Sequence, residues 1–238
     1  ISFTPEEDGE FRITLVNQSA GGSAAHLYRL AIREAKPDFQ MMVSTELTKT
    51  INNDAWPVPP IARRGGSVVY RVFAFREDGF DGDIEVSIKG LPEGVSAKPL
   101  ILSGATQEGF LTVQASAGAK EWHGAVTISG AAQIGGKALS RVAHPASILW
   151  GKRVFANSSQ VRSRLDLETV LSVIGNEIEP TQLLPREDKV WTVAMGETLE
   201  LPIKTIETGR RTGNLQVNVQ GFPGLHRSPP TAAIAETA

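Results

Sequence analysis

The 238-residue chain contains no cysteine, which excludes disulfide bonds, thiolate nucleophiles and cysteine-ligated metals. Neither sign of charge is in marked excess, since 24 lysines and arginines stand against 26 aspartates and glutamates, for a formal net charge of -2. A nearly neutral chain has no electrostatic reason to bind nucleic acid or an anionic membrane. No apolar run approaches the roughly 18 residues of a membrane helix. We therefore expect neither nucleic-acid binding nor membrane insertion.

Motifs that carry catalysis or bind cofactors are also missing. The four histidines, His26, His123, His144 and His226, are far apart in the sequence, and none belongs to an HExxH motif. The chain has no G-x-S-x-G elbow, no phosphate-binding P-loop and no dinucleotide fingerprint. The sequence accordingly predicts a protein that is not an enzyme and has no cofactor.

Glycine and proline are what the chain has in quantity, with 23 and 14 residues that separate short runs of alternating apolar and polar residues. Many short alternating runs between turn residues are typical of β-sandwiches. The segment 161–174 can also be read as a short amphipathic helix, but Gly175-Asn176 and Pro180 follow closely, so we favour a strand there. The sequence predicts an all-β protein.

The stretch 66–95 is the clearest pattern in the chain. An apolar run, Val68 to Phe75, and an alternating run, Ile84 to Ile88, flank the turn-forming pair Asp78-Gly79. Two such runs around a Gly/Asp turn predict a β-hairpin.

A second copy of this pattern occupies Gly196 to Leu225. Gly66 and Gly79 have counterparts in Gly196 and Gly209 at the same spacing, which indicates tandem domains of one superfamily. Glycine recurs at such turns because they need a positive φ that other residues resist. The predicted structural turn residues of the two copies are Gly79, Gly82, Gly90, Pro92, Gly209, Gly213, Gly221 and Pro223.

These patterns divide the chain into four parts. We expect the last strands of a sandwich in 1–44, a proline-rich linker in 45–57, a complete sandwich of about seven strands in 58–150, and a truncated sandwich in 151–238. The predicted fold is thus tandem immunoglobulin-like antiparallel β-sandwiches, the first and last of them incomplete.

Residues 8 to 35 resemble the C-terminal end of the bacterial pre-peptidase C-terminal domain, a small β-sandwich of secreted proteins. The likeness lies in Asp8-Gly9-Glu10-Phe11-Arg12-Ile13, which fits the family's DG-x-[FY] step, and in Tyr28-Arg29-Leu30-Ala31-Ile32-Arg33, which fits its closing strand. The resemblance implies that these residues form two strands of a domain whose earlier strands lie upstream.

The rest of the chain resembles the immunoglobulin-like domains that follow pre-peptidase domains in large exported proteins of planctomycete-type bacteria. Arg76 to Glu85, Gly90 to Val95 and Gly221 to Leu225 carry this likeness. The resemblance implies a non-catalytic module that spaces, presents or docks other domains of the same polypeptide, or that meets a protein or polysaccharide at the cell surface. It also implies an extracellular, cell-surface or periplasmic location.

The acidic turn offers one alternative site. Glu77, Asp78, Asp81 and Asp83 have carboxylates that a calcium ion could bind, the three aspartates being the core of such a loop, because hard cations prefer several oxygen ligands in one loop. In the second copy the acidic positions are not kept: they become Thr208, Arg210, Arg211 and Asn214. A turn whose acids are replaced by arginines is first a turn, so the sequence favours a structural role.

Aromatic residues offer a second alternative. Trp122 with His123, in a predicted loop, and Trp56 among prolines are the candidate ligand contacts. Exposed tryptophans on one face would make a carbohydrate-binding module, which is one alternative function. An accessory domain of a secreted hydrolase is the other, and it requires His and Asp or Glu side chains to cluster around a nucleophile.

Overall fold

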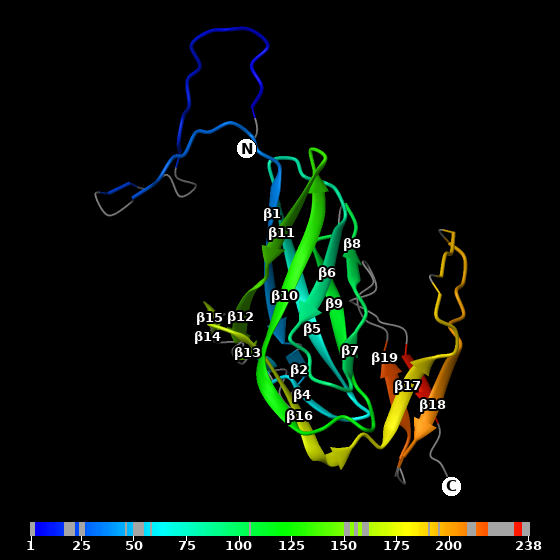
Figure 1. The fold of residues 1–238 in the computed structure, drawn as a ribbon. Coiled ribbons are helices and arrows are strands. Elements are labelled where there is room, and N and C mark those ends of the chain that lie inside the picture. The colour runs from blue at the N-terminus through cyan, green and yellow to red at the C-terminus, as the bar shows by residue number, and fades with distance from the viewer. Residues whose placement is uncertain are drawn as a thin grey trace.

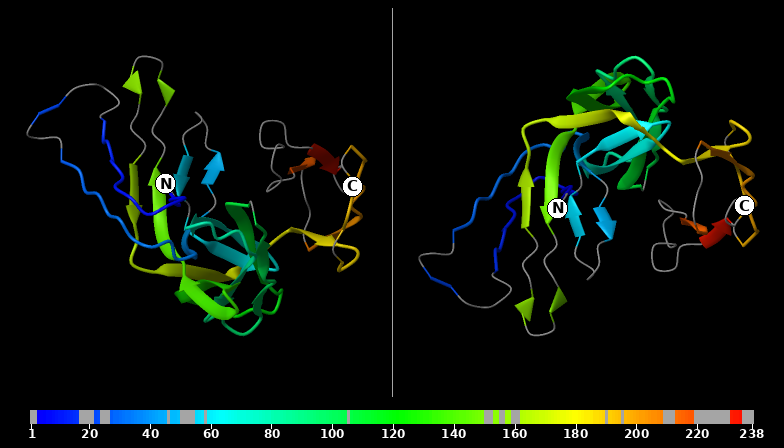
Figure 2. Two further views of the ribbon diagram at one scale, coloured as in Figure 1. Left: turned by 90° about the horizontal axis from the view of Figure 1, so that it is seen from above. Right: turned by 90° about the horizontal axis from the view of Figure 1, so that it is seen from below.

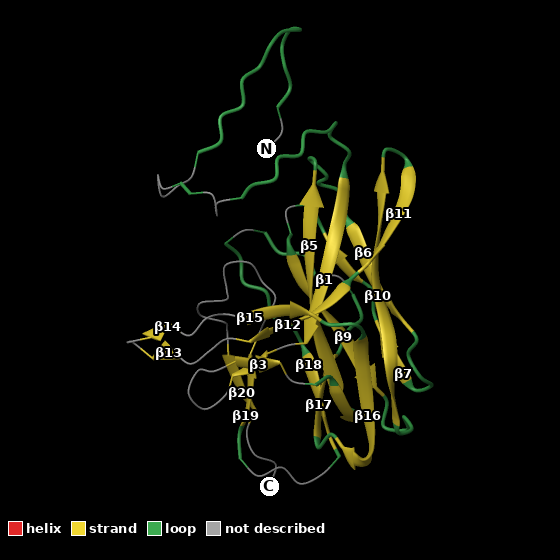
Figure 3. Cartoon of the chain, turned by 90° about the vertical axis from the view of Figure 1, so that its left-hand side faces the viewer, coloured by secondary structure: helices red, strands yellow, loops and turns green. Residues whose placement is uncertain are grey.

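The computed structural model describes residues 3–16, 22–23, 27–45, 47–49, 55–57, 59–104, 106–149, 153–154, 157–158, 162–189, 191–194, 196–208, 213–218 and 231–234. All regular structure in these residues is β-strand, as Figures 1 and 3 show, which confirms the predicted all-β class. Within the same residues there is no helix with the length and apolar character needed to cross a membrane.

The first of two large sheets has the strand order β15-β12-β1-β5-β9-β7. Its centre is antiparallel, with β1 paired to β5 and β5 to β9, whereas β12 runs parallel to β1. Its strands are β1 (Asp38–Thr45), β5 (Ser67–Glu77), β7 (Val95–Ala97), β9 (Glu108–Ala115), β12 (His144–Leu149) and β15 (Arg162–Leu165).

The second large sheet has the order β4-β16-β10-β6-β8, and β11 also pairs with β10. The long strand β10 pairs with β16 through its first half, Trp122 to Val126, and with β11 through its second half, Ser129 to Ile134. The strands are β4 (Ile61–Arg64), β6 (Ile84–Lys89), β8 (Leu100–Leu102), β10 (Trp122–Ile134), β11 (Lys137–Val142) and β16 (Thr169–Ile178).

The core lies between these two sheets. Alternate residues of a strand point to opposite faces, so the apolar positions of β1, β5, β6 and β10 all turn inward. One buried cluster joins side chains from both sheets and from residues before 45 and after 168, among them Phe39, Met41, Tyr70, Val72, Ile84, Val86, Leu111, Ile128, Leu171 and Val173. The two sheets therefore form a single sandwich.

The sequence predicted a β-hairpin for the stretch 66–95, and this prediction is wrong. Its turn is tight, because the backbone N–H of Phe80 donates to the Glu77 carbonyl at 3.0 Å. However, β5 belongs to the first sheet and β6 to the second, so the turn carries the chain across the sandwich. Alternation gives the same signal for a strand in either sheet, which is why it did not distinguish an arch from a hairpin.

The edges of the sandwich do not coincide with the predicted boundaries at 44–45, 57–58 and 150–151. Strand β1 precedes the first of these boundaries, and β16 follows the last, yet both belong to the two large sheets. Short strands extend from the sandwich beside β1 and β12: β2 (Leu47–Lys49) pairs with β3 (Ala55–Pro57), and β13 (Arg153–Val154) pairs with β14 (Asn157–Ser158).

The N-terminal segment before β1 was predicted to contain two strands, and this is wrong for its described residues. Residues 11–16 and 27–33 are extended but belong to no sheet. Their apolar side chains are exposed, with 54% for Phe11 and 75% for Ile32. A β-strand needs a neighbouring strand to which its backbone can hydrogen-bond, and these residues pair with none of the described strands. Figure 1 shows the segment leading away from the sandwich.

The C-terminal residues form separate two-stranded sheets. Strand β17 (Thr181–Pro185) pairs with β18 (Ile203–Glu207), and β19 (Leu215–Asn218) pairs with β20 (Thr231–Ile234). In the second copy of the sequence pattern, the two runs form β18 and β19, and these strands belong to different sheets. The two runs of the first copy, β5 and β6, also belong to different sheets. Figure 2 shows these strands and the N-terminal segment on opposite sides of the sandwich.

Candidate functional site

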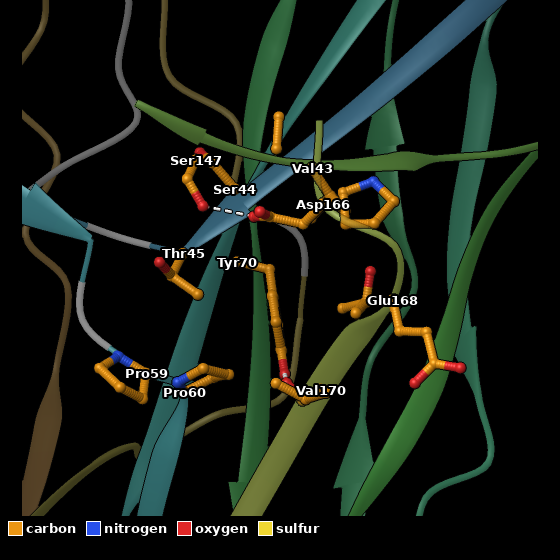
Figure 4. Close-up of a pocket in the computed structure, with 13 residues that line it drawn as sticks. Val43, Ser44, Thr45, Pro59, Pro60, Tyr70, Ser147, Asp166, Glu168 and Val170 are labelled. Carbon is orange, nitrogen blue, oxygen red and sulfur yellow. Dashed lines mark hydrogen bonds between the residues drawn. The ribbon is translucent and has the colours of Figure 1, made fainter. Parts of the chain in front are cut away.

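A cavity of about 280 Å³ lies where β1 and β12 meet the link between β15 and β16 (Figure 4). Several separate parts of the chain contribute to its wall, because the first sheet and the second sheet meet at this end of the sandwich. The described lining residues are Val43, Ser44, Thr45, Pro59, Pro60, Tyr70, Pro145, Ala146, Ser147, Asp166, Glu168, Thr169 and Val170.

Tyr70 forms part of the wall from the core side. It occupies an inward position of β5 and is 1% exposed. Its hydroxyl donates a hydrogen bond of 2.6 Å to the carbonyl of Val170 on β16, so it ties the first sheet to the second. Burial raises the pKa of the Tyr70 phenol, because the apolar surroundings disfavour the phenolate. Tyr70 is therefore a neutral structural donor at this site.

The opposite wall is acidic. The hydroxyl of Ser147 on β12 donates to a carboxylate oxygen of Asp166, and the backbone N–H of Asp166 donates to the Pro145 carbonyl at 2.8 Å. In Figure 4 the Glu168 carboxylate points away from Asp166 and Ser147, and Glu168 is an exposed residue. Among the described lining residues, the ionisable side chains other than Tyr70 are the carboxylates of Asp166 and Glu168.

Two buried hydroxyls also line the cavity. Ser44 is 9% exposed and Thr169 is 8% exposed, and they are the buried polar residues of the described chain. The buried side-chain atoms without a hydrogen-bond partner in the described residues are not these hydroxyls but Nε of Arg64 and Nε of Arg76.

In the acidic turn, the Asp78 carboxylate is bound to protein groups and is not placed with the other acids as calcium ligands would be. The Asp78 carboxylate accepts hydrogen bonds from the Arg33 guanidinium and, at 2.8 Å, from the backbone N–H of Lys36. These two contacts lower the pKa of Asp78, the Arg33 bond being the larger cause. In the described part of the chain, no three His, Asp or Glu side chains are placed to hold a metal, and this includes Asp78, Asp81 and Asp83.

Trp122 and His123 lie on strand β10, not in the loop that was predicted for them. Neighbouring residues on a strand point to opposite faces, and here Trp122 packs partly against the core while His123 is exposed. They therefore cannot form one contact site. Trp56 lies on β3, and its side chain is outside the described residues, as is all of Trp150. Trp191 lies beneath the Lys189 ammonium, 3.9 Å from the ring centroid.

The predicted turn residues have different geometries. Gly79, Gly90 and Gly213 have positive φ angles of 80°, 86° and 92°. Gly82 does not, but a Cβ there would lie 2.8 Å from the Phe80 ring. The carbonyl of Pro92 accepts a 3.1 Å hydrogen bond from the backbone N–H of Val95, which closes the turn before β7. Gly209, Gly221 and Pro223 lie outside the described residues.

The sequence did not indicate the cavity or the outer face of β5. That face carries Arg71, whose guanidinium lies 5.1 Å from the Phe73 ring centroid and 5.9 Å from that of Phe110, and which pairs with Glu108 at 2.6 Å. The only signal in the sequence was the apolar run from Val68 to Phe75. The cavity residues had no local signal, because they come from segments far apart in the sequence.

Comparison with known proteins adds no relative. No family model, no curated protein and no solved structure matches this chain. The resemblance to pre-peptidase and immunoglobulin-like domains therefore rests on the short motifs in residues 8–35, 76–85, 90–95 and 221–225.

Proposed function

We propose that this chain is a non-catalytic structural module that holds and presents neighbouring units of a large exported or cell-surface bacterial protein. The observation that carries the proposal is that charged side chains join the sandwich to the segments on both sides of it. These contacts lie at the two junctions, where they set the direction in which the chain enters and leaves the sandwich.

At the N-terminal junction, Asp78 holds the segment before β1. Its carboxylate binds both the Arg33 side chain and the Lys36 backbone, two points of the same segment. Asp78 and Gly79 have positive φ angles of 51° and 80°, the geometry of a type I′ turn. This turn fixes the backbone from which the Asp78 carboxylate extends. One side chain thereby restrains the approach of the preceding unit.

At the C-terminal junction, only Glu179 and Pro180 separate β16 from β17. The backbone N–H of Glu179 donates to the Arg64 carbonyl at 2.8 Å. The Arg63 guanidinium pairs with Glu177 at 2.6 Å and with Glu179 at 3.5 Å. A junction this short, bonded to the neighbouring strand β4, restricts the orientation of the C-terminal strands.

The strand order supports an immunoglobulin-like assignment for the sandwich. Strands β1-β5-β9-β7 follow the A-B-E-D order of an immunoglobulin sheet, and β11-β10-β6 follow the G-F-C order of the facing sheet. Together with the resemblance in Arg76 to Glu85, this order favours a spacer domain of an exported multidomain protein.

The N-terminal junction can be tested by single-molecule energy transfer. Because the chain has no cysteine, dyes can be attached at E10C and Q114C, two exposed positions on either side of the junction. We expect a narrow distance distribution that broadens in D78A and stays narrow in D81A, the matched control in the same turn. Equal distributions in all three proteins would rule out the proposed restraint by Asp78.

A further inference from the structure

We propose that the outer face of the first sheet binds a neutral oligosaccharide, whose sugar rings stack on surface phenylalanines of β5 and β9. This binding site goes beyond the structural role proposed above and uses none of the tryptophans considered from the sequence. Its side chains, named the aromatic face, are Phe73 and Phe75 on β5, Phe110 on β9, and the ion pair of Arg71 with Glu108 that joins the two strands.

The strand register brings these side chains together. Arg71 lies opposite Phe110 on the antiparallel pair of β5 and β9, and two positions further along β5, Phe73 lies opposite Glu108. Side chains two residues apart on a strand share a face, so Phe75 continues the row beyond Phe73. None of the three phenylalanines belongs to the buried core cluster of the described residues. They are surface rings carried by two paired strands.

The exposure of these rings is the first argument. Phe75 is 52% exposed, and Phe73 and Phe110 are half-buried. A hollow of about 450 Å³ lies beside Phe73 and Phe75, and Gln107 and Glu108 also line it. This volume is within the range of ligand pockets, and a group of apolar side chains on a protein surface is typical of a binding site.

The ion pair is the second argument. Nε and Nη2 of Arg71 both donate to Oε2 of Glu108, at 3.2 and 2.6 Å, so Nη1 and Oε1 take no part in this pair. The two side chains are 35% and 46% exposed and have opposite charges, which favours a neutral ligand over an ion. A donor beside an acceptor matches two neighbouring hydroxyls of a sugar, because a hydroxyl can accept from the guanidinium or donate to the carboxylate.

The position of Arg71 is the third argument. Its guanidinium lies 5.1 Å from the Phe73 ring centroid and 5.9 Å from that of Phe110. Cation–π attraction and the bond to Glu108 therefore hold the polar group beside the two rings before a ligand arrives. Groups that are already in place lose less conformational freedom on binding.

A pyranose matches both parts of the aromatic face. Its C–H surface can stack on a phenyl ring while the hydroxyls at its edge reach Arg71 and Glu108. A proline-rich peptide can also pack against phenyl rings, but proline has no N–H to donate to the Glu108 carboxylate. The ion pair therefore favours the saccharide over the peptide.

The test is a titration of the full chain followed by ¹H–¹⁵N NMR. The neutral probes are the β-1,4-linked hexasaccharides of glucose, xylose, mannose and N-acetylglucosamine, and the comparison probes are hexagalacturonate, which is anionic, and decaproline. We expect at least one neutral hexasaccharide to bind with a Kd of about 0.1–1 mM, because an open face makes few contacts with each ring. Its shifts should centre on amides of β5 and β9.

Variants at Phe75 localise the binding. F75L keeps an apolar side chain but removes the ring, and it should weaken binding at least about fivefold, the effect of losing one stacked ring. F75W restores a ring and should bind at least as tightly as the parent. I101A is the matched control, because Ile101 is 53% exposed on β8 of the other sheet, and it should bind normally.

A variant of the ion pair gives a second, independent measurement. E108Q keeps the size of the side chain but replaces an acceptor oxygen with an amide, so it should also weaken binding at least about fivefold. Glu108 is exposed, so we expect E108Q to fold, which dispersed NMR signals would verify.

Three outcomes would overturn the proposal. The first is that no neutral hexasaccharide binds at about 5 mM, and the second is that binding is unchanged in both F75L and E108Q. The third is that hexagalacturonate or decaproline shifts the amides of β5 and β9 and the neutral probes do not. None of these results bears on the restraint by Asp78, which is measured independently with dyes.

Discussion

Tyr70 connects the core, the second sheet and the cavity through one side chain. Its ring is buried among inward residues of β5, and its hydroxyl donates to Val170 of β16 at 2.6 Å. The bond links the first sheet to β16, which is also held by its ladders with β10 and β4. The cavity wall next to Thr169 depends on the same strand.

Replacing this hydroxyl tests its contribution. We expect Y70F to lower the free energy of unfolding by about 1–2 kcal/mol at pH 7, because the Val170 carbonyl loses a buried partner. Urea denaturation monitored by tryptophan fluorescence measures the change. A variant as stable as the parent would contradict the assigned hydrogen bond.

The difference in stability between the parent protein and Y70F should depend on pH. The pKa of Tyr70 is raised on folding, so its stabilisation is complete below the ordinary tyrosine pKa of about 10 and is lost as pH rises toward the folded value. The difference in stability between parent and Y70F should therefore shrink by up to about 1.4 kcal/mol per pH unit above pH 10. A constant difference up to pH 11 would contradict the buried phenol.

The turn between β5 and β6 is the element that the chain repeats. Asp78 and Gly79 both have positive φ, and the Phe80 ring packs against Phe39 with ring centroids 5.7 Å apart. In the second copy the glycines recur at corresponding positions and the acids do not. What is repeated is the crossing from one sheet to the other, and Asp78 adds a contact to Arg33 that belongs to the first copy.

Gly79 is the residue on which this turn depends. We expect G79V to lower the free energy of unfolding by about 1–2 kcal/mol, because a β-branched residue is strained at a φ of 80°. Thermal unfolding followed by circular dichroism measures the effect. Gly118 is the control, since it is exposed, has no positive φ, and a Cβ there would meet no atom within 4 Å. Equal losses in G79V and G118V would refute the conformational requirement.

In the whole molecule, the sandwich is completed by strands from outside its predicted limits. Strand β1 contributes Phe39 and Met41 to the core, and β16 contributes Leu171 and Val173, each of them at most 2% exposed. Burying one such side chain is worth about 1.5–3 kcal/mol, and whole domains are stable by only about 5–15 kcal/mol. Losing these four buried side chains would remove about 6–12 kcal/mol, which is comparable with the whole margin.

Two fragments test this arrangement. Residues 36–180 contain every strand of the two large sheets and should unfold cooperatively, with well-dispersed NMR signals. Residues 58–150 lack β1, β15 and β16 and should show the narrow dispersion of an unfolded chain. A folded 58–150 fragment would show that the sandwich does not need these strands.

Local features of the structure were predictable, and long-range ones were not. The runs around Phe39, Phe110 and Val170 alternate, and the structure has strands at all three. Residues 11–16 and 27–33 alternate equally well, but they have no ladder in the described structure. Alternation reports that a residue run suits a sheet, and it does not report whether a partner strand is present.

The cavity was beyond sequence reasoning for the same reason. Ser44, Tyr70 and Thr169 belong to three strands, and each is an ordinary residue in its own segment. They come together at one end of the sandwich only because strands far apart in the sequence meet there.

Local chemistry in the chain is sufficient to specify an all-β protein, the positions of most sandwich strands and the Asp78-Gly79 turn, because side-chain period and backbone φ are properties of neighbouring residues. The pairing of strands follows a different rule. Any strand edge offers the same backbone donors and acceptors, so the choice of partner depends on which apolar faces can be buried together. Packing of the complete chain therefore placed β5 and β6 in opposite sheets, brought β1 and β16 into one core, and formed the cavity between them.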